Sequence, residues 1–177
     1  TRDFISPYQW CPYEDLIGDA VDLIHSNTVF FDENENTIYF NGRNVNTFYK
    51  IDHATGEVIW GLGEYGNFTL YDINGVERSN LFYHAHAVER IDENRFIVFD
   101  NDYHNQTDPD SRSSAIREIV INETAMTANV SWQWVSPETY WSVRWGDADR
   151  LANCNRLGTF GTETHVNTTL GPRLVEI

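Results

Sequence analysis

The stretch NTVFFDENENTIYFNGRNVNTFYKIDHATGEVIW, residues 27–60, decides the fold. It holds four short runs, NTVFFD, TIYFNG, NTFYKID and EVIW, in which apolar and polar residues alternate. Turn-forming clusters separate them, DENEN after the first run and HATG after the third. This pattern is typical of β-strands joined by hairpins. The stretch therefore predicts four antiparallel strands that end at Trp60.

The same pattern returns twice further along the chain. Residues 86–135 contain HAVERID, RFIVFDN, SAIREIVI and ANVSWQWV, and residues 146–177 contain GDADRL, RLGTFGT and PRLVEI. Asn36, Asn94 and Asn155 occupy equivalent first turns of the three units. Repeated units of four antiparallel strands are typical of β-propeller blades. A β-sandwich is the alternative, and the likeness between the units favours the propeller.

We therefore expect one all-β propeller domain with two and a half to three blades. The expected division is an N-terminal segment with a short helix over 1–24, the first blade and its connection over 25–82, the second blade over 83–143, and part of a third over 144–177. An open stack of blades exposes apolar faces and a bare sheet edge. Either a longer protein or another chain is expected to complete it, by self-assembly or by adding a strand to the third blade.

Composition excludes several classes of partner. The 177 residues carry 27 acidic and 12 basic side chains, for a net charge of −15. A nucleic-acid-binding protein needs an excess of Lys and Arg, and an acidic surface is repelled by anionic membranes. No apolar run approaches the ~18 residues of a membrane span. We expect neither nucleic-acid binding nor a membrane span.

Two features indicate an oxidising compartment. N-x-S/T sequons, in excess over chance, stand at Asn67, Asn105, Asn122, Asn129 and Asn167. They predict an extracellular or secreted protein with N-linked glycans. Cys11 and Cys154 are either two free thiols or one disulfide. A disulfide between them would stabilise the fold by about 4–5 kcal/mol. It would form only in an oxidising compartment.

Three local motifs favour structural roles. GLGEYG at 61–66 matches a dinucleotide fingerprint, but a strand and a turn follow it where a helix is required. The DENEN turn and the acidic stretch over 100–110 favour solvated loops over cation sites. His84 and His86 lie on one face of a strand, but spacing indicates no third metal ligand. We expect no metal and no cofactor.

A set of polar side chains is distributed over two blades. His25 and Asn27 stand at the start of the first strand of unit one, and His86 at the start of unit two. Because the innermost strands of a propeller face its channel, these residues are expected to meet at one mouth, and Arg43 to join them. Together they would bind a sulfate or phosphate ester and supply a nitrogen nucleophile. The alternative is a buried network that plugs the channel.

At these residues the chain resembles the arylsulfotransferase family. DLIHSNTV (22–29) is similar to the family's D-x-x-H-x-N-S-V, and NGRNVNTFYKID (41–52) to S-S-R-x-x-N-T-V-x-K-I-D. TGEVIWGLG (55–63) is similar to G-x-I-x-W-x-L-G-G. HAVERIDENRFIVFDN (86–101) runs without gaps against H-D-A-R-x-L-P-N-G-N-x-x-L-F-D-N, and ETAMTANVSWQW (123–134) resembles the strand carrying A-M-T-A.

The resemblance implies a six-bladed propeller in which a His takes the sulfuryl group from a phenyl sulfate and passes it to another phenol, without a cofactor. His25 and His86 match the motif histidines and Asn27 the motif Asn. They would bind the sulfuryl oxygens and assist proton transfer. Arg43 matches the motif Arg and would add positive charge.

The chain also departs from the family pattern. It has HAHA at 84–87 where the family has Q-H-D-A around the motif His. Arg112 fits the family's S-R motif only with a loop insertion, and Ser114 stands where a gapless alignment expects Arg. No residue matches the nucleophilic His securely, and His165 is a positional candidate.

Two functions follow. The first, which we favour, is a non-catalytic extracellular module with a structural, assembly or surface role. The sequons, the unmatched nucleophile and the open third blade support it. The second is a sulfuryl transferase that moves sulfate from an aryl sulfate to a phenol through a sulfohistidine. Whether the chain is an enzyme stays open at this point.

Overall fold

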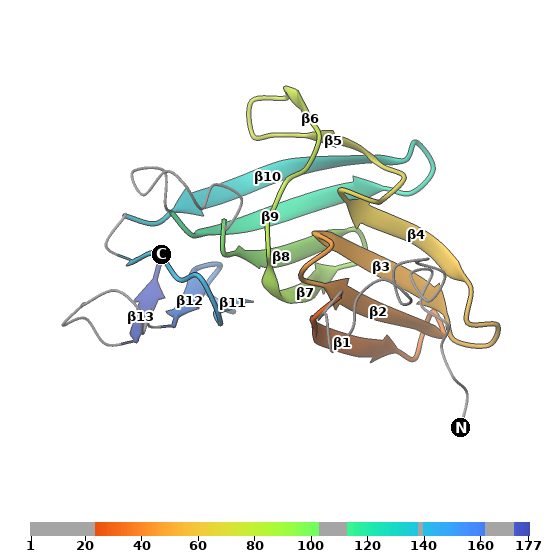
Figure 1. Ribbon diagram of the computed structural model, residues 1–177, viewed down its shortest axis with the longest axis horizontal. Coiled ribbons are helices and arrows are strands. Elements are labelled where there is room, and N and C mark those ends of the chain that lie inside the picture. Colours follow the sequence, from red (N-terminus) through yellow and green to blue (C-terminus); the bar gives the residue numbers. More distant parts are fainter. Residues whose placement is uncertain (1–23, 103–112, 138–139, 162–171) are drawn as a thin grey trace, which may run out of the picture.

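The computed structural model describes residues 24–102, 113–137, 140–161 and 172–177. This part of the chain forms thirteen strands in sheets of four, six and three strands (Figure 1). The all-β prediction is confirmed. The predicted helix near the N-terminus and most of the polar stretch after Asp100 lie outside the described residues.

The first sheet is the one that residues 27–60 predict. Its strands lie in chain order and pair antiparallel. They are β1 (Ser26–Asp32), β2 (Thr37–Gly42), β3 (Thr47–Asp52) and β4 (Val58–Gly63). The alternating pattern places aromatic side chains of all four strands on one face, where they pack together.

The second sheet contains the four predicted strands and two more. The predicted ones are β7 (His86–Asp92), β8 (Arg95–Asp100), β9 (Ala115–Asn122) and β10 (Thr127–Val135). The additional strands are β5 (Thr69–Tyr71) and β6 (Glu77–Arg78), of which β5 pairs parallel to β10. Part of the connection that follows the first blade therefore extends the outer edge of the second.

The third sheet has three described strands, as expected for a partial blade. They are β11 (Asp147–Arg150), β12 (Arg156–Phe160) and β13 (Arg173–Glu176), in that order. Among the described strands, β13 pairs with β12 alone. The outer edge of this sheet is open within the part of the chain that the structure describes.

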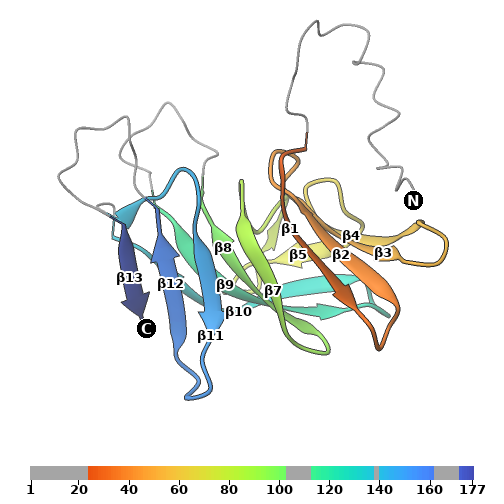
Figure 2. The same cartoon turned by 90° about the horizontal axis from the view of Figure 1, so that it is seen from below.

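The three sheets are arranged as consecutive blades of a partial propeller. The innermost strand of each sheet is its first, and β7 lies between β1 and β11 (Figure 2). Between the first and second sheets, Phe96 packs against the rings of Tyr39, Phe48 and Trp60. Between the second and third, Phe160 contacts Phe99 with ring centroids 4.9 Å apart. Each junction thus has its own aromatic core.

Two sequence expectations concern other parts of the chain. Cys154 is exposed with a free thiol and Cys11 lies outside the described residues, so their disulfide stays a prediction. In the part of the chain that the structure describes, no helix is long and apolar enough to cross a membrane.

Candidate anion site at the start of the innermost strands

The backbone takes the same unusual conformation just before each innermost strand. His25 precedes β1 with a φ of 47°, His84 precedes β7 with a φ of 53°, and Trp145 precedes β11 with a φ of 58°. Left-handed backbone is costly for residues other than glycine, and such strain is concentrated at functional sites. These three positions define the end of the molecule that we call the mouth.

Asparagine side chains hold the backbone of the mouth in place. Asn27 Nδ2 and Asn41 Nδ2 each donate to the carbonyl oxygen of Ala85 at 2.8 Å, and Asn41 also donates to Asn27 Oδ1. The amide of His84 donates to Asn46 Oδ1 at 2.8 Å. The first blade therefore fixes the residues that lead into the second.

His86 is fixed by a different asparagine. Its Nδ1 lies 2.7 Å from Oδ1 of Asn101, whose Nδ2 donates to the carbonyls of Ser142 and Trp145. Because the amide oxygen only accepts, Nδ1 of His86 carries the proton in this arrangement. The neutral ring therefore has its lone pair on Nε2, where it can accept a proton or act as a nucleophile.

Arg43 joins the first blade to the segment before the third. Its Nη1 donates to Asn44 Oδ1 at 2.7 Å and its Nη2 to the carbonyl of Val143 at 3.4 Å. Both acceptors are neutral amide oxygens.

The electrostatics place four basic side chains close together. Burial, followed by the charges of Arg43, His86 and His25, lowers the pKa of His84 to about 4. Burial also lowers the pKa of His86, and Arg43 and His25 add to this effect, whereas the bond to Asn101 opposes it. Both rings are therefore neutral at pH 7. Because part of this lowering comes from neighbouring positive charge, a bound anion would counter it and favour the protonated rings.

The innermost strands of the second and third blades carry carboxylates. Burial raises the pKa of Glu89 on β7, and Asp149 and Asp147 on β11 raise it further. The pKa of Asp147 is raised by burial and by Asp149. Asp147 is the first residue of β11, two residues after Trp145, so this negative charge begins beside the mouth and disfavours entry of an anion further along the strands. No group of three metal-ligating side chains gathers within the described ranges.

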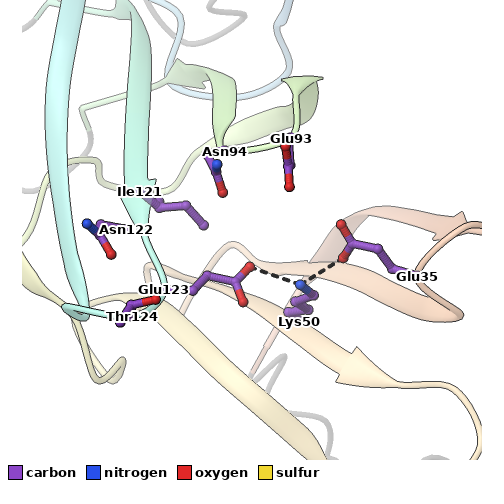
Figure 3. A pocket seen from close by; sticks show the side chains of 8 residues that line it. All are labelled: Glu35, Lys50, Glu93, Asn94, Ile121, Asn122, Glu123 and Thr124. Atoms are coloured by element: carbon purple, nitrogen blue, oxygen red, sulfur yellow. Dashed lines mark hydrogen bonds and ion pairs between the residues drawn. The ribbon is translucent and has the colours of Figure 1, made fainter.

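A pocket of about 410 Å³ lies at the opposite end, beside the hairpin turns (Figure 3). The side chains that line it are Glu35, Lys50, Glu93, Asn94, Ile121, Asn122, Glu123 and Thr124. Lys50 Nζ lies 2.7 Å from Glu35 Oε2 and 2.9 Å from Glu123 Oε1. Burial alone would lower the pKa of Lys50, but these two bonds raise it above its ordinary value. The ammonium therefore remains charged, and its contacts join the first and second blades.

The comparison with protein families gives the decisive observation. A family model described as Arylsulfotransferase (ASST) matches residues 2–177. The chain belongs to the arylsulfotransferase family. The resemblance drawn from the sequence motifs is thereby confirmed. No curated protein matches the chain.

The mouth contains most of the residues that match the arylsulfotransferase motifs. His25, Asn27, Arg43 and His86 come together there, from two blades. Arg112 and His165 lie outside the described residues. Ser114 is buried and its Oγ accepts from the amide of Ser142, so it supports the segment that Asn101 also binds. His86 faces Asn101 through its Nδ1.

Sequence reasoning missed the amides that hold this arylsulfotransferase site together, chiefly Asn41, Asn46 and Asn101. Asn46 and Asn101 had a signal, because Asn46 matches the Asn of the motif at 41–52 and Asn101 ends the FDN of the motif at 86–101. The exposed asparagines of the sequons that the structure describes are Asn67, Asn122 and Asn129, while Asn105 and Asn167 lie outside the described residues.

Proposed function

We propose that the mouth binds the sulfuryl group of an aryl sulfate and takes part in its transfer to a phenol. The observation that carries this proposal is the clustering of His25, His84 and His86 around Arg43, with the pKa of His84 and His86 lowered. Family membership supplies the class of substrate. We further propose that the protein works outside the cell and carries N-linked glycans, which the exposed Asn67, Asn122 and Asn129 support.

The proposed chemistry assigns distinct work to the residues. Arg43 attracts the sulfate ester and balances charge on its oxygens. The bond from sulfur to the aryl oxygen breaks as a bond from sulfur to an imidazole nitrogen forms, and the leaving phenolate takes up a proton. A second phenol then gives up its proton, bonds to sulfur and releases the imidazole. The leaving phenolate takes its proton from solvent, and the unprotonated Nε2 of His86, whose ring Asn101 fixes, is suited to accept the proton of the second phenol.

The test measures transfer and binding with the full chain. Wild type is expected to release 4-nitrophenol from 4-nitrophenyl sulfate when a second phenol is present, and to bind phenyl sulfate in calorimetry. Substituting His86→Ala should reduce turnover by at least 100-fold, in the range of general acid–base contributions. His53→Gln is the matched control, because His53 contacts Phe31 and Asn36 at the hairpin turns of the first blade. Absence of both binding and turnover in wild type would overturn the proposal.

A non-catalytic assembly role is the second candidate, and the third sheet favours it. Among the described strands β13 pairs on one side only, and Leu174 on that strand is 68% exposed. An open edge with an apolar side chain accepts a strand from a partner. Leu174→Lys should then shift the sedimentation coefficient of the secreted protein toward the monomer, with Val76→Lys on the β5–β6 hairpin as the control. A wild type that sediments as a monomer at all concentrations would exclude this role.

A further inference from the structure

We propose that Trp145 binds the aryl ring of the ester held at the mouth and makes the site select aryl sulfates over alkyl and inorganic sulfate. This inference rests on the proposed function, because it assigns the second half of the same ligand. Its own basis is the position, the exposure and the support of the Trp145 indole.

Position is the first argument. Trp145 stands two residues before β11, as His84 stands two residues before β7, and both have left-handed backbone. His25 stands one residue before β1, also with left-handed backbone. Two of the three blades thus present imidazole rings at the mouth, and the third presents an indole. An aryl sulfate likewise joins an anionic group to an aromatic ring.

A shared hydrogen-bond partner is the second argument. Asn101, whose exposure is 0%, binds Nδ1 of His86 at 2.7 Å and the carbonyl oxygen of Trp145 at 2.9 Å. Ser142 Oγ lies 3.1 Å from that carbonyl oxygen and 2.7 Å from the carbonyl oxygen of Arg144, its nearer acceptor. The backbone of Trp145 is therefore held in a fixed relation to the imidazole that we assign to proton exchange.

The surroundings of the indole are the third argument. Trp145 is 55% exposed, although it is the residue type with the largest apolar surface to bury. A Cβ built on Gly161 would lie 3.1 Å from Trp145 Cε3, so the ring rests against a glycine that leaves room for it. Strained backbone, a supported edge and an open face are expected of a stacking platform, because aromatic rings gain from offset or edge-to-face contact with another ring.

The test compares three ligands: phenyl sulfate, methyl sulfate and inorganic sulfate. Dissociation constants are measured by calorimetry with the full chain and with Trp145→Ala and Trp145→Phe. Trp145→Ala should weaken phenyl sulfate about 3- to 10-fold, the range that one aromatic contact supplies, and leave the other two ligands unchanged. Trp145→Phe should retain most of the affinity. Tyr65→Ala is the matched control, because Tyr65 is 59% exposed on the turn after β4.

Each outcome separates this inference from the proposed function. If wild type binds all three ligands equally, or Trp145→Ala weakens all three equally, the aryl assignment is wrong and the anion site stands. If wild type binds none of them, both proposals fail. Fluorescence provides a second measurement should Trp145→Ala not fold: 4-nitrophenyl sulfate should quench wild type more than Trp145→Phe, and equal quenching contradicts the inference.

Discussion

The two ends of the innermost strands are built from different chemistry. At the mouth, neutral amides such as Asn27, Asn41 and Asn101 hold left-handed backbone and uncharged imidazoles. At the hairpin-turn end, ion pairs join neighbouring blades: Arg90 binds Asp32 and Glu35. Figure 3 shows a third such contact, from Lys50.

Ion pairs also join the second blade to the third. Glu118 is 1% exposed and is bound by three guanidinium groups, those of Arg95, Arg150 and Arg156. At the mouth side, Asp100 is paired with Arg117. Charge pairing between blades is thus concentrated at the turn end. At the mouth the Asp100–Arg117 pair lies within the second sheet, and neutral amides link the blades there.

The largest expected effect comes from removing an ion-pair centre at the turn end. Glu118→Ala leaves three arginines around an empty position and should lower the free energy of unfolding by about 3–5 kcal/mol, as for other broken buried pairs. Urea denaturation measures it. Exposed Glu57→Gln is the control and should stay within about 0.5 kcal/mol. Loss of sulfate binding in Glu118→Ala, measured where the protein is still folded, would contradict the division between the ends.

The second prediction makes the corresponding change at the mouth. Asn101→Asp keeps an acceptor for His86 but removes the donor to Ser142 and Trp145, and its charge should raise the pKa of His86. We expect a smaller loss of stability, about 1–3 kcal/mol for unsatisfied buried groups, and a turnover profile shifted to higher pH. Asn80→Asp is a suitable control, since Asn80 is also buried but donates to Phe82. An unchanged pH profile would exclude control of His86 by Asn101.

The sequence predicted the blades because period-two alternation with turn clusters is a local signal. His25, Asn27 and His86 stand at the starts of β1 and β7, and Arg43 follows β2, as the strand pattern indicated. It did not predict the parallel pairing of β5 with β10, because the residues that pair are far apart in the chain and β5 has only three residues. Glu118 is similar: alternation alone does not indicate a buried carboxylate, which is tolerated only because arginines from two blades surround it.

The third prediction concerns pH and the repulsion at the mouth. The pKa of His84 is about 4 in the folded protein and near 6.5 when unfolded. The unfolded chain therefore binds more protons between these values, and stability should fall as pH is lowered from about 6.5 to about 4. In His84→Gln, the melting temperature should no longer show the part of this fall that is due to His84. In wild type, added sulfate should make the fall in melting temperature smaller, because it stabilises the protonated ring of His84. His53→Gln is the control. A melting curve of His84→Gln with the full wild-type pH dependence would contradict the assignment.

The smallest effect is expected between the two ends, where carboxylates of β7 and β11 face each other. The raised pKa of Glu89 means that the folded state prefers the protonated form, so its charge costs stability at pH 7. Glu89→Gln should therefore raise the free energy of unfolding, by no more than about 1 kcal/mol, because solvent reaches Glu89 and screens its charge despite the partial burial that raises its pKa. The gain should shrink as pH falls and wild-type Glu89 takes up its proton, and it should shrink with added salt.

The control is Glu93→Gln, in the turn between β7 and β8. If Glu89→Gln instead lost stability at pH 7, Glu89 would help to hold the blades together. The contrast between a stabilising turn end and a strained mouth would then not apply to the middle of the strands.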